Sequence, residues 1–517
     1  MKTKILVLVL LFLAIPVWSQ ASKIQVDFSN EQIGENFLNG KKIMASAYVF
    51  PKRIHEIYVD TFPGYVSLQL RKLSKNGKIL NVKGEFVVFD FENRIVKWSQ
   101  KIDYSRGNIN QYNRLIMEDK GNNLISLSIE NGEELWTVKN DFYYVNTAKD
   151  IAIGYKNKGL AGNIHTLEAI DLKTGNALWE RELKRDYGWN SKIRLNDSTL
   201  LIVAGGLHSV NLFNGNGWDY ETVTGKKDYT ETIAKNAAGI ALGILTGTYV
   251  TSSGPSVVRE VVSNVIIDSA NLYVASKEKI AQINKNDGHV NWSTNLPEDL
   301  MSKSSIFLKD SLLYVVNYGY AYWGNKKIDF GQPFIQCLNA NTGKQLFLKT
   351  IADKENPILD FRKKEDALMA IFKDKLVCFS LIDGSEIQSK LIDVVELGEL
   401  KYFTTNTIFV KENETVFKNL VSNDNTTYYI QSSKEKTLVF GSDLTNKMYY
   451  ELKDLYFKYG SYKNYTFIGN EEETILLNNE NRKVGRLDIS VNSLIYNGKL
   501  FNFNDEKLLV VDMATIF

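Results

Sequence analysis

The sequence predicts an all-β fold built from a repeated unit of four short strands, and three observations support this prediction. First, the segment Leu167–Trp179, LEAIDLKTGNALW, joins an alternating apolar run, a turn with a glycine, and a tryptophan. Alternation of this kind is typical of a strand with one buried face. Second, similar segments recur in one register. Third, their basic interval is about 40 residues, which accommodates four short strands and their turns.

The turn of this unit occurs seven times in the sequence. A polar residue ends the strand at a key position, and the turn residue follows four positions later. The key positions are Asp90, Ser128, Asp171, Asn211, Asn284, Asn339 and Ser380. The turn residues are Arg94, Gly132, Gly175, Gly215, Gly288, Gly343 and Gly384. Successive key positions lie 38, 43, 40, 73, 55 and 41 residues apart, so two intervals contain insertions.

Each position of the unit has a physical reason. The polar key residue can accept hydrogen bonds from the backbone of the turn, and the glycine supplies the positive φ that a bulged hairpin turn requires. Five units then place a tryptophan three or four positions after the turn residue: Trp98, Trp136, Trp179, Trp218 and Trp292. We expect this large flat side chain to dock each blade of a ring onto the next blade.

Together these units predict a single β-propeller domain over residues 21–517. The segment LNNENRKVGR adds a copy near the C-terminus, in which Asn478, Asn481 and Arg482 repeat the pattern of the first turn. The segment YYIQSSKEKTLVF contains a weaker copy. Eight four-stranded blades is the best count from these copies, and seven or nine blades stay open.

The N-terminus has the three-part layout of a secretory signal peptide. Lys2 and Lys4 precede an apolar run over residues 5–17, and cleavage after Ser19 or Ala21 satisfies the small-residue rule. The apolar run is shorter than the roughly 20 residues of a membrane-spanning helix. We therefore expect residues 1–20 to be removed and the mature chain to be periplasmic or extracellular. No cysteine follows the apolar run, so we expect no lipid anchor.

Charge and cysteine content limit the classes of function. The chain has 62 Lys and Arg against 60 Asp and Glu, and removal of Lys2 and Lys4 makes the mature chain formally neutral. This balance gives no basic footprint for nucleic acid. Cys337 and Cys378 are too few for a disulfide framework, and whether they pair stays open.

The segment EAIDLKTGNALW resembles the repeat of the pyrroloquinoline-quinone-like β-propellers. This family includes quinoprotein alcohol dehydrogenases and the propeller lipoprotein of the outer-membrane barrel-assembly machinery. The resemblance is strongest over residues 124–179 and extends over 84–388. It implies a propeller fold and says little about activity, because one propeller fold hosts many functions.

The sequence predicts no catalytic residue, cofactor or metal ion. In the resembled dehydrogenases, two adjacent cysteines lie over the quinone, whereas Cys337 and Cys378 lie 41 positions apart here. His55, His165, His208 and His289 are isolated and match no catalytic spacing. The segment NGNGWDYE offers oxygen donors, but their spacing is not that of a calcium loop.

Two insertions are the candidate interaction loops. The insertion at about 219–264 carries Gly239, Gly243 and Gly247 at every fourth position, which would make a smooth helical face for a partner. A helix or hairpin folded over the propeller itself is the alternative. The insertion at 314–334 places Tyr318, Tyr320 and Trp323 near a tip, where aromatic rings can stack on a sugar or anchor a protein. A hairpin packed on the adjoining blade is the alternative.

The sequence therefore favours a secreted, non-enzymatic propeller that binds protein or glycan as a scaffold in the cell envelope or outside the cell. An alternative is an envelope-assembly role of the barrel-assembly propeller type. A carbohydrate-active enzyme or a quinone-dependent enzyme is a further alternative. The partner and the oligomeric state are not predicted.

Overall fold

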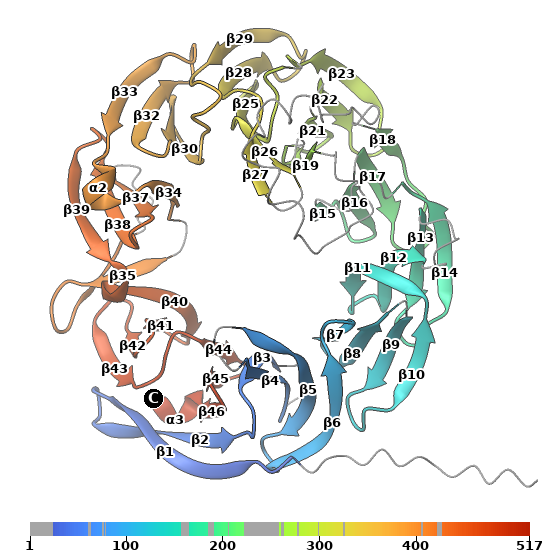
Figure 1. The fold of residues 1–517 in the computed structure, drawn as a ribbon, viewed down its shortest axis with the longest axis vertical. Coiled ribbons are helices and arrows are strands. Elements are labelled where there is room, and N and C mark those ends of the chain that lie inside the picture. Colours follow the sequence, from blue (N-terminus) through green and yellow to red (C-terminus); the bar gives the residue numbers. More distant parts are fainter. Residues whose placement is uncertain are drawn as a thin grey trace, which may run out of the picture.

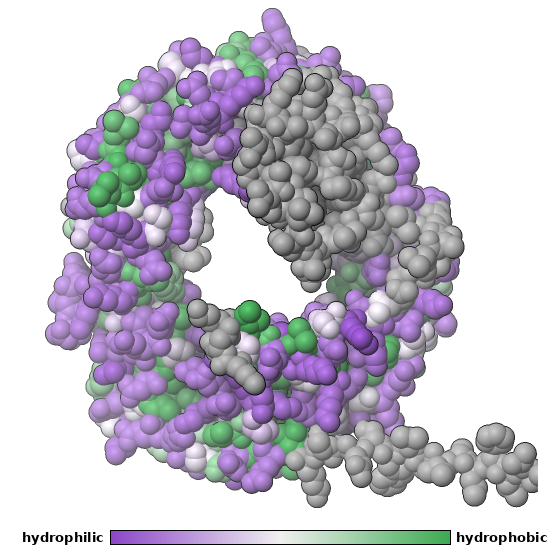
Figure 2. All heavy atoms as spheres, in the orientation of Figure 1, coloured by the Kyte–Doolittle hydropathy of each residue, from purple (hydrophilic) through white to green (hydrophobic). Residues whose placement is uncertain are grey.

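The chain is a β-propeller, seen in a computed structural model. The described residues are 24–59, 64–74, 77, 79–121, 123–156, 165–184, 191–204, 206–221, 258–259, 263–276, 279–297, 299–323, 326–404, 407–420 and 427–517. The predicted signal peptide, residues 1–20, and Gly239, Gly243 and Gly247 lie outside them. Antiparallel sheets form a ring whose inner strands surround the centre and whose outer strands lie at the rim (Figure 1), and the space-filling view shows an opening at the centre (Figure 2).

Blades 1 to 4 are separate four-stranded sheets. Blade 1 contains β3 (Ile54–Val59), β4 (Tyr65–Leu73), β5 (Leu80–Asp90) and β6 (Ile95–Asp103). Blade 2 contains β7 (Gly107–Tyr112), β8 (Leu115–Lys120), β9 (Asn123–Ser128) and β10 (Glu134–Val138). Blade 3 contains β11 (Asn140–Asn146), β12 (Ile151–Lys156), β13 (Thr166–Asp171) and β14 (Ala177–Glu182). Blade 4 contains β15 (Ser191–Arg194), β16 (Thr199–Val203), β17 (Gly206–Asn211) and β18 (Asp219–Glu221).

Blades 5 to 8 are also separate four-stranded sheets. Blade 5 contains β20 (Ile266–Ile267), β21 (Asn271–Ala275), β22 (Lys279–Asn284) and β23 (Val290–Asn295). Blade 6 contains β24 (Ser304–Lys309), β25 (Leu312–Asn317), β28 (Phe334–Asn339) and β29 (Gln345–Thr350). Blade 7 contains β30 (Asp360–Lys364), β31 (Ala367–Ile371), β32 (Lys375–Ser380) and β33 (Glu386–Leu391), followed by the helix α2 (Val394–Leu397). Blade 8 contains β34 (Leu400–Phe403), β37 (Thr427–Ser432), β38 (Lys436–Gly441) and β39 (Asn446–Glu451).

An eleven-stranded sheet completes the ring. It includes blade 9, formed by β40 (Leu455–Tyr462), β41 (Tyr465–Gly469), β42 (Thr474–Leu477) and β43 (Lys483–Leu487). It also includes blade 10, formed by β44 (Ser493–Tyr496), β45 (Lys499–Asn504), β46 (Lys507–Asp512) and the N-terminal strand β2 (Lys41–Val49). The described residues therefore form ten groups of four strands, two more than the eight blades that the repeats predict.

The N-terminal strand β1 (Asp27–Asn36) closes the ring as a strap. It pairs with β2 along its length and with the rim strand β43 through its last three residues, so it joins blade 10 to blade 9. The buried Asn36 side chain donates a 2.7 Å hydrogen bond to the carbonyl oxygen of Ile516, in the C-terminal helix α3 (Met513–Ile516). Both ends of the described chain thus meet at one closure (Figure 1).

A hairpin inside blade 8 forms a wedge against blade 9. It consists of β35 (Ile408–Lys411) and β36 (Phe417–Asn419), and β35 pairs with β40. Ile408 and Val410 pack on blade 8, whereas Phe409 packs on blade 9. Alternate side chains of one strand therefore serve two interfaces, as the pleat dictates. The repeat pattern did not predict this hairpin.

The turns explain why the repeats are visible in the sequence. Gly175 has a φ of 73°, and Arg94 adopts the same left-handed region at 61°. In the C-terminal copy the residue with positive φ is Asn481, at 57°, so the turn comes one residue earlier than the predicted alignment on Arg482. Asn tolerates this conformation because its short side chain can bond locally.

Candidate binding site

The tryptophan positions lie at the contacts between blades. In each of five units the indole N–H donates a hydrogen bond to a backbone carbonyl of the next blade. The pairs and donor–acceptor distances are Trp98–Ile129 2.8 Å, Trp136–Leu172 3.0 Å, Trp179–Leu212 2.8 Å, Trp218–Lys285 3.0 Å and Trp292–Ala340 2.9 Å. Trp98, Trp136 and Trp179 are buried, whereas Trp218 and Trp292 are half-buried.

The turn glycine of each next blade faces the tryptophan ring. A Cβ atom added to Gly215 would lie 2.5 Å from the Trp179 ring, and the other four tryptophans contact the next glycine in the same way. Glycine is therefore needed at this place for its positive φ and for the close approach of the ring. In blade 6, Phe347 takes the tryptophan's place against Gly384.

The aromatic side chains of the second insertion are more buried than the exposed tip that the sequence predicts. Tyr320 is only 7% exposed, which contradicts that expectation. The Tyr318 ring lies 5.9 Å from the ring of Phe361 in blade 7, and its hydroxyl lies 3.0 Å from Ser305 Oγ. These contacts fit the alternative of a hairpin packed on the adjoining blade.

This hairpin belongs to a small three-stranded sheet of β19 (Val258–Arg259), β26 (Tyr320–Trp323) and β27 (Lys326–Asp329). Lys327 Nζ lies 3.7 Å from the centroid of the Tyr320 ring, a cation–π contact. The backbone of Trp323 is in β26, and its side chain lies outside the described part of the structure.

The carboxylates of the segment NGNGWDYE form ion pairs. Asp219 Oδ1 lies 2.7 Å from His208 Nδ1 and 2.7 Å from an Arg181 nitrogen, and Glu221 pairs with Lys184. Burial raises the pKa of Asp219, but the hydrogen bonds from His208 and Arg181 outweigh it and hold the pKa below its usual value. Because Arg181 comes from blade 3, this cluster also ties blade 3 to blade 4.

The two cysteines are free and serve different blade interfaces. Cys337 is part of the core between blades 6 and 7, whereas Cys378 packs against the core between blades 7 and 8. Burial raises the pKa of both thiols. Among the described residues, no group of three or more His, Cys, Asp or Glu side chains is arranged to hold a metal ion.

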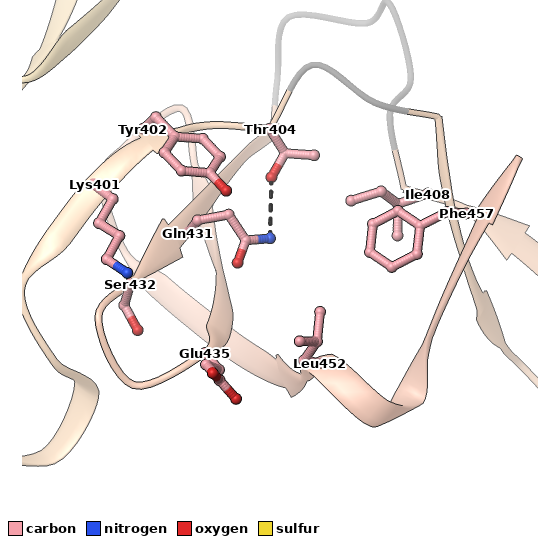
Figure 3. A pocket seen from close by; sticks show the side chains of 9 residues that line it. All are labelled: Lys401, Tyr402, Thr404, Ile408, Gln431, Ser432, Glu435, Leu452 and Phe457. Carbon is pink, nitrogen blue, oxygen red and sulfur yellow. Dashed lines mark hydrogen bonds between the residues drawn. The ribbon is translucent and has the colours of Figure 1, made fainter. Parts of the chain in front are cut away.

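A cavity of about 190 Å³ lies between blade 8 and the wedge hairpin (Figure 3). Its lining residues come from β34, β35, β37 and β40 and from the segments that connect blade 8 internally and to blade 9. They are Lys401, Tyr402, Thr404, Ile408, Gln431, Ser432, Glu435, Leu452 and Phe457. Sequence reasoning missed this cavity because its lining is drawn from separate segments, with no local motif.

Exposed apolar side chains gather along the outer strand of blade 7. Ile382, Leu391 and Val395 are 80, 73 and 81% exposed, the highest values of any large apolar side chain in the described residues. Ile387 lies between them on β33 and is also exposed. Figure 2 shows hydrophobic atoms at the rim in the region of β33 and α2. We call these four residues the blade 7 stripe.

Comparisons with known proteins identify the type of repeat. A family model described as outer membrane protein assembly factor BamB matches residues 72–294. No curated protein matches the chain. Among solved structures, BamB from Moraxella catarrhalis is 10% identical, with 74% of this chain and 96% of that chain covered and a TM-score of 0.33. A europium-containing methanol dehydrogenase is 9% identical, with 75% and 84% covered and a TM-score of 0.29.

Within the described residues, no helix combines the length and the apolar character that a bilayer crossing requires.

Proposed function

From the repeats of the pyrroloquinoline-quinone-like β-propeller family over residues 72–294, we propose that this chain is a non-enzymatic scaffold that binds a partner protein in the cell envelope. The family model is named for an assembly factor of the outer membrane, and scaffolding by a rigid ring suits such a role. The closure by β1 and β2 supports rigidity, because it links the last two blades to the N-terminus.

The blade 7 stripe is the observation that carries the proposal. Isolated exposed apolar residues are ordinary, but several within one short stretch of the rim indicate a candidate interaction surface. Ile387 lies at the bulge of β33 and Leu391 at the end of the same strand, and both are exposed. Ile382 lies before the strand and Val395 after it, so the stripe follows the whole outer strand. We assign the partner's contact to this edge.

The contacts of both ring nitrogens support a structural role for His208. Its Nδ1 contacts Asp219, and its Nε2 lies 3.4 Å from the carbonyl oxygen of Ala204. Both ring nitrogens are thus engaged within blade 4, which favours packing over proton transfer to a substrate.

The test is affinity purification of the tagged protein from the envelope fraction of its own cells. Ile387→Asp places a charge in the stripe, and Leu135→Asp is the matched control. Leu135 occupies the same position of the repeat in blade 2, and the two side chains are 57% and 59% exposed. The proposal predicts a co-purifying protein that is lost with Ile387→Asp and retained with Leu135→Asp. Equal recovery with both variants would contradict a contact at blade 7.

Export is the second part of the proposal, and it rests on Lys2, Lys4 and the apolar run that follows them. The mature protein from the cell envelope should begin at Gln20, after cleavage at Ser19, or at Ser22, after cleavage at Ala21. Mass spectrometry of the intact mature chain checks this. A chain that retains residues 1–20 in the cytoplasm would contradict export.

A further inference from the structure

We propose that the cavity between blade 8 and the wedge hairpin binds one neutral sugar ring, a function independent of partner binding at blade 7. The cavity has a polar wall and an apolar wall that face each other across about 190 Å³ (Figure 3). A cavity of about 150 Å³ is enough for benzene, so this one accommodates a six-membered ring with substituents.

The polar wall presents donors and acceptors that the protein itself leaves available. The Gln431 amide nitrogen donates to Thr437 Oγ1 at 2.7 Å and makes a longer contact with Thr404 Oγ1 at 3.4 Å. These bonds fix the amide so that its carbonyl oxygen points into the cavity (Figure 3). Gln431 thus offers an acceptor, and the Thr404 hydroxyl offers a donor.

Ser432 provides the most specific indication of a ligand. The residue is 2% exposed, and its Oγ has no hydrogen-bond partner among the described residues. A buried hydroxyl without a partner destabilises the folded chain, so such groups in native proteins call for an explanation. A ligand hydroxyl would satisfy Ser432 once its side chain turns toward the cavity, because the Oγ has almost no accessible surface in the orientation that the structure shows.

The opposite wall is apolar and includes one aromatic ring. Ile408, Leu452 and Phe457 form it, on the far side of the cavity from Gln431 and Ser432 (Figure 3). A pyranose has hydroxyl groups at its edge and a face of C–H bonds, and that face packs well on an aromatic ring. The division of the cavity into two walls therefore matches the two characters of a sugar ring.

The charges at the cavity favour a neutral ligand. Lys401 and Glu435 contribute one positive and one negative side chain, so the lining has no net charge. Both residues are exposed, as are Tyr402 and Leu452 of the apolar wall, so these four residues lie at the open side of the cavity. A small zwitterionic amino acid such as glycine or alanine also matches one charge of each sign, but it has no extended apolar face for the opposite wall.

The test is saturation-transfer NMR of the full-length protein with the methyl glycosides of glucose, mannose, galactose and N-acetylglucosamine, each at millimolar concentration. Free glycine and alanine are the competing probes. We expect transfer to at least one glycoside and none to the amino acids. Absence of transfer to all four glycosides, or transfer to the amino acids alone, would overturn the proposal.

Two variants and one control locate the site. Ser432→Ala should weaken glycoside binding without lowering the melting temperature, because Oγ has no partner to lose. Phe457→Leu should weaken binding by about tenfold through loss of the aromatic face. Tyr449→Leu is the control, because Tyr449 lies on β39, the rim strand of blade 8, and outside the cavity lining. This variant should bind the glycosides as the parent does. Undiminished binding by Ser432→Ala and Phe457→Leu would show that the sugar binds elsewhere and refute the assignment.

Discussion

At the residue scale, the side chains that mark the repeat also hold its turn. Asp171 Oδ1 accepts hydrogen bonds from the backbone of Lys173 and Thr174 and from the Thr174 hydroxyl. Asn339 makes the same three contacts in blade 6, so an amide oxygen serves as well as a carboxylate. This equivalence explains why both Asp and Asn occur at the key position.

Asp171→Asn should therefore keep the stability of the protein at pH 7 and reduce its loss in acid. Burial raises the pKa of Asp171, but the turn hydrogen bonds outweigh it and lower the pKa overall. A carboxylate with a lowered pKa stabilises the fold above its unfolded pKa, about 4, and this contribution disappears as the pH falls through the lower, folded value. Melting temperatures at pH 7 and pH 3 measure the effect. Equal acid losses in parent and variant would contradict it.

Trp179→Ala should lower the free energy of unfolding by about 3–5 kcal/mol, the usual cost of removing a large buried aromatic side chain. The ring fills the interface of blades 3 and 4 and its N–H bonds to Leu212. Leu178→Ala, one position earlier and exposed, is the control and should cost much less. Urea unfolding of both variants provides the comparison, and similar losses would refute a docking role for Trp179.

At the scale of elements, the strap β1 depends on one glycine. A Cβ atom at Gly34 would lie 2.0 Å from the carbonyl oxygen of Arg486, in the partner strand β43. Any side chain there must push β1 away from blade 9. The closure of the ring thus depends on a position that the repeat pattern does not include.

Gly34→Val should lower the free energy of unfolding by about 1–3 kcal/mol or more, because that is the usual cost of forcing a side chain into a packed site. Ser29→Val is the control, because Ser29 is exposed on β1 and pairs only with β2. Hydrogen exchange should also show faster exchange of the β43 amides with Gly34→Val. Unchanged exchange at β43 would contradict the strap.

The sequence predicted the elements that repeat, and it did not predict the elements that lie outside the repeat. The glycine and tryptophan positions made the blades visible as far as Gly384. Beyond that point the residues with positive φ include Leu444 and Asn481, which carry no glycine signal, and no tryptophan follows. Blade 9 gave one copy of the turn and blade 8 only a weaker one, whereas blade 10, the wedge hairpin and the cavity gave none, so the predicted count was two short.

At the scale of the whole molecule, the residues that hold the blades together differ from those that we propose to bind a partner. The repeated positions form the blade contacts, and the exposed apolar residues of blade 7 lie outside those contacts. The cavity at blade 8 is a second surface, to which the wedge hairpin contributes Ile408 and blade 9 contributes Phe457. A rigid closed ring can therefore hold two independent binding surfaces at fixed positions. The central claim is that a partner protein contacts the first of them.

Site-specific photo-crosslinking in living cells tests that claim most directly. A photoreactive residue is placed in turn at Leu391 and Val395, in the blade 7 stripe, and at Leu135 and Leu178, exposed on blades 2 and 3. A scaffold that binds through blade 7 predicts one crosslinked partner at the two stripe positions and none at the two control positions. Crosslinks at the control positions alone, or at none of the four, would contradict the account.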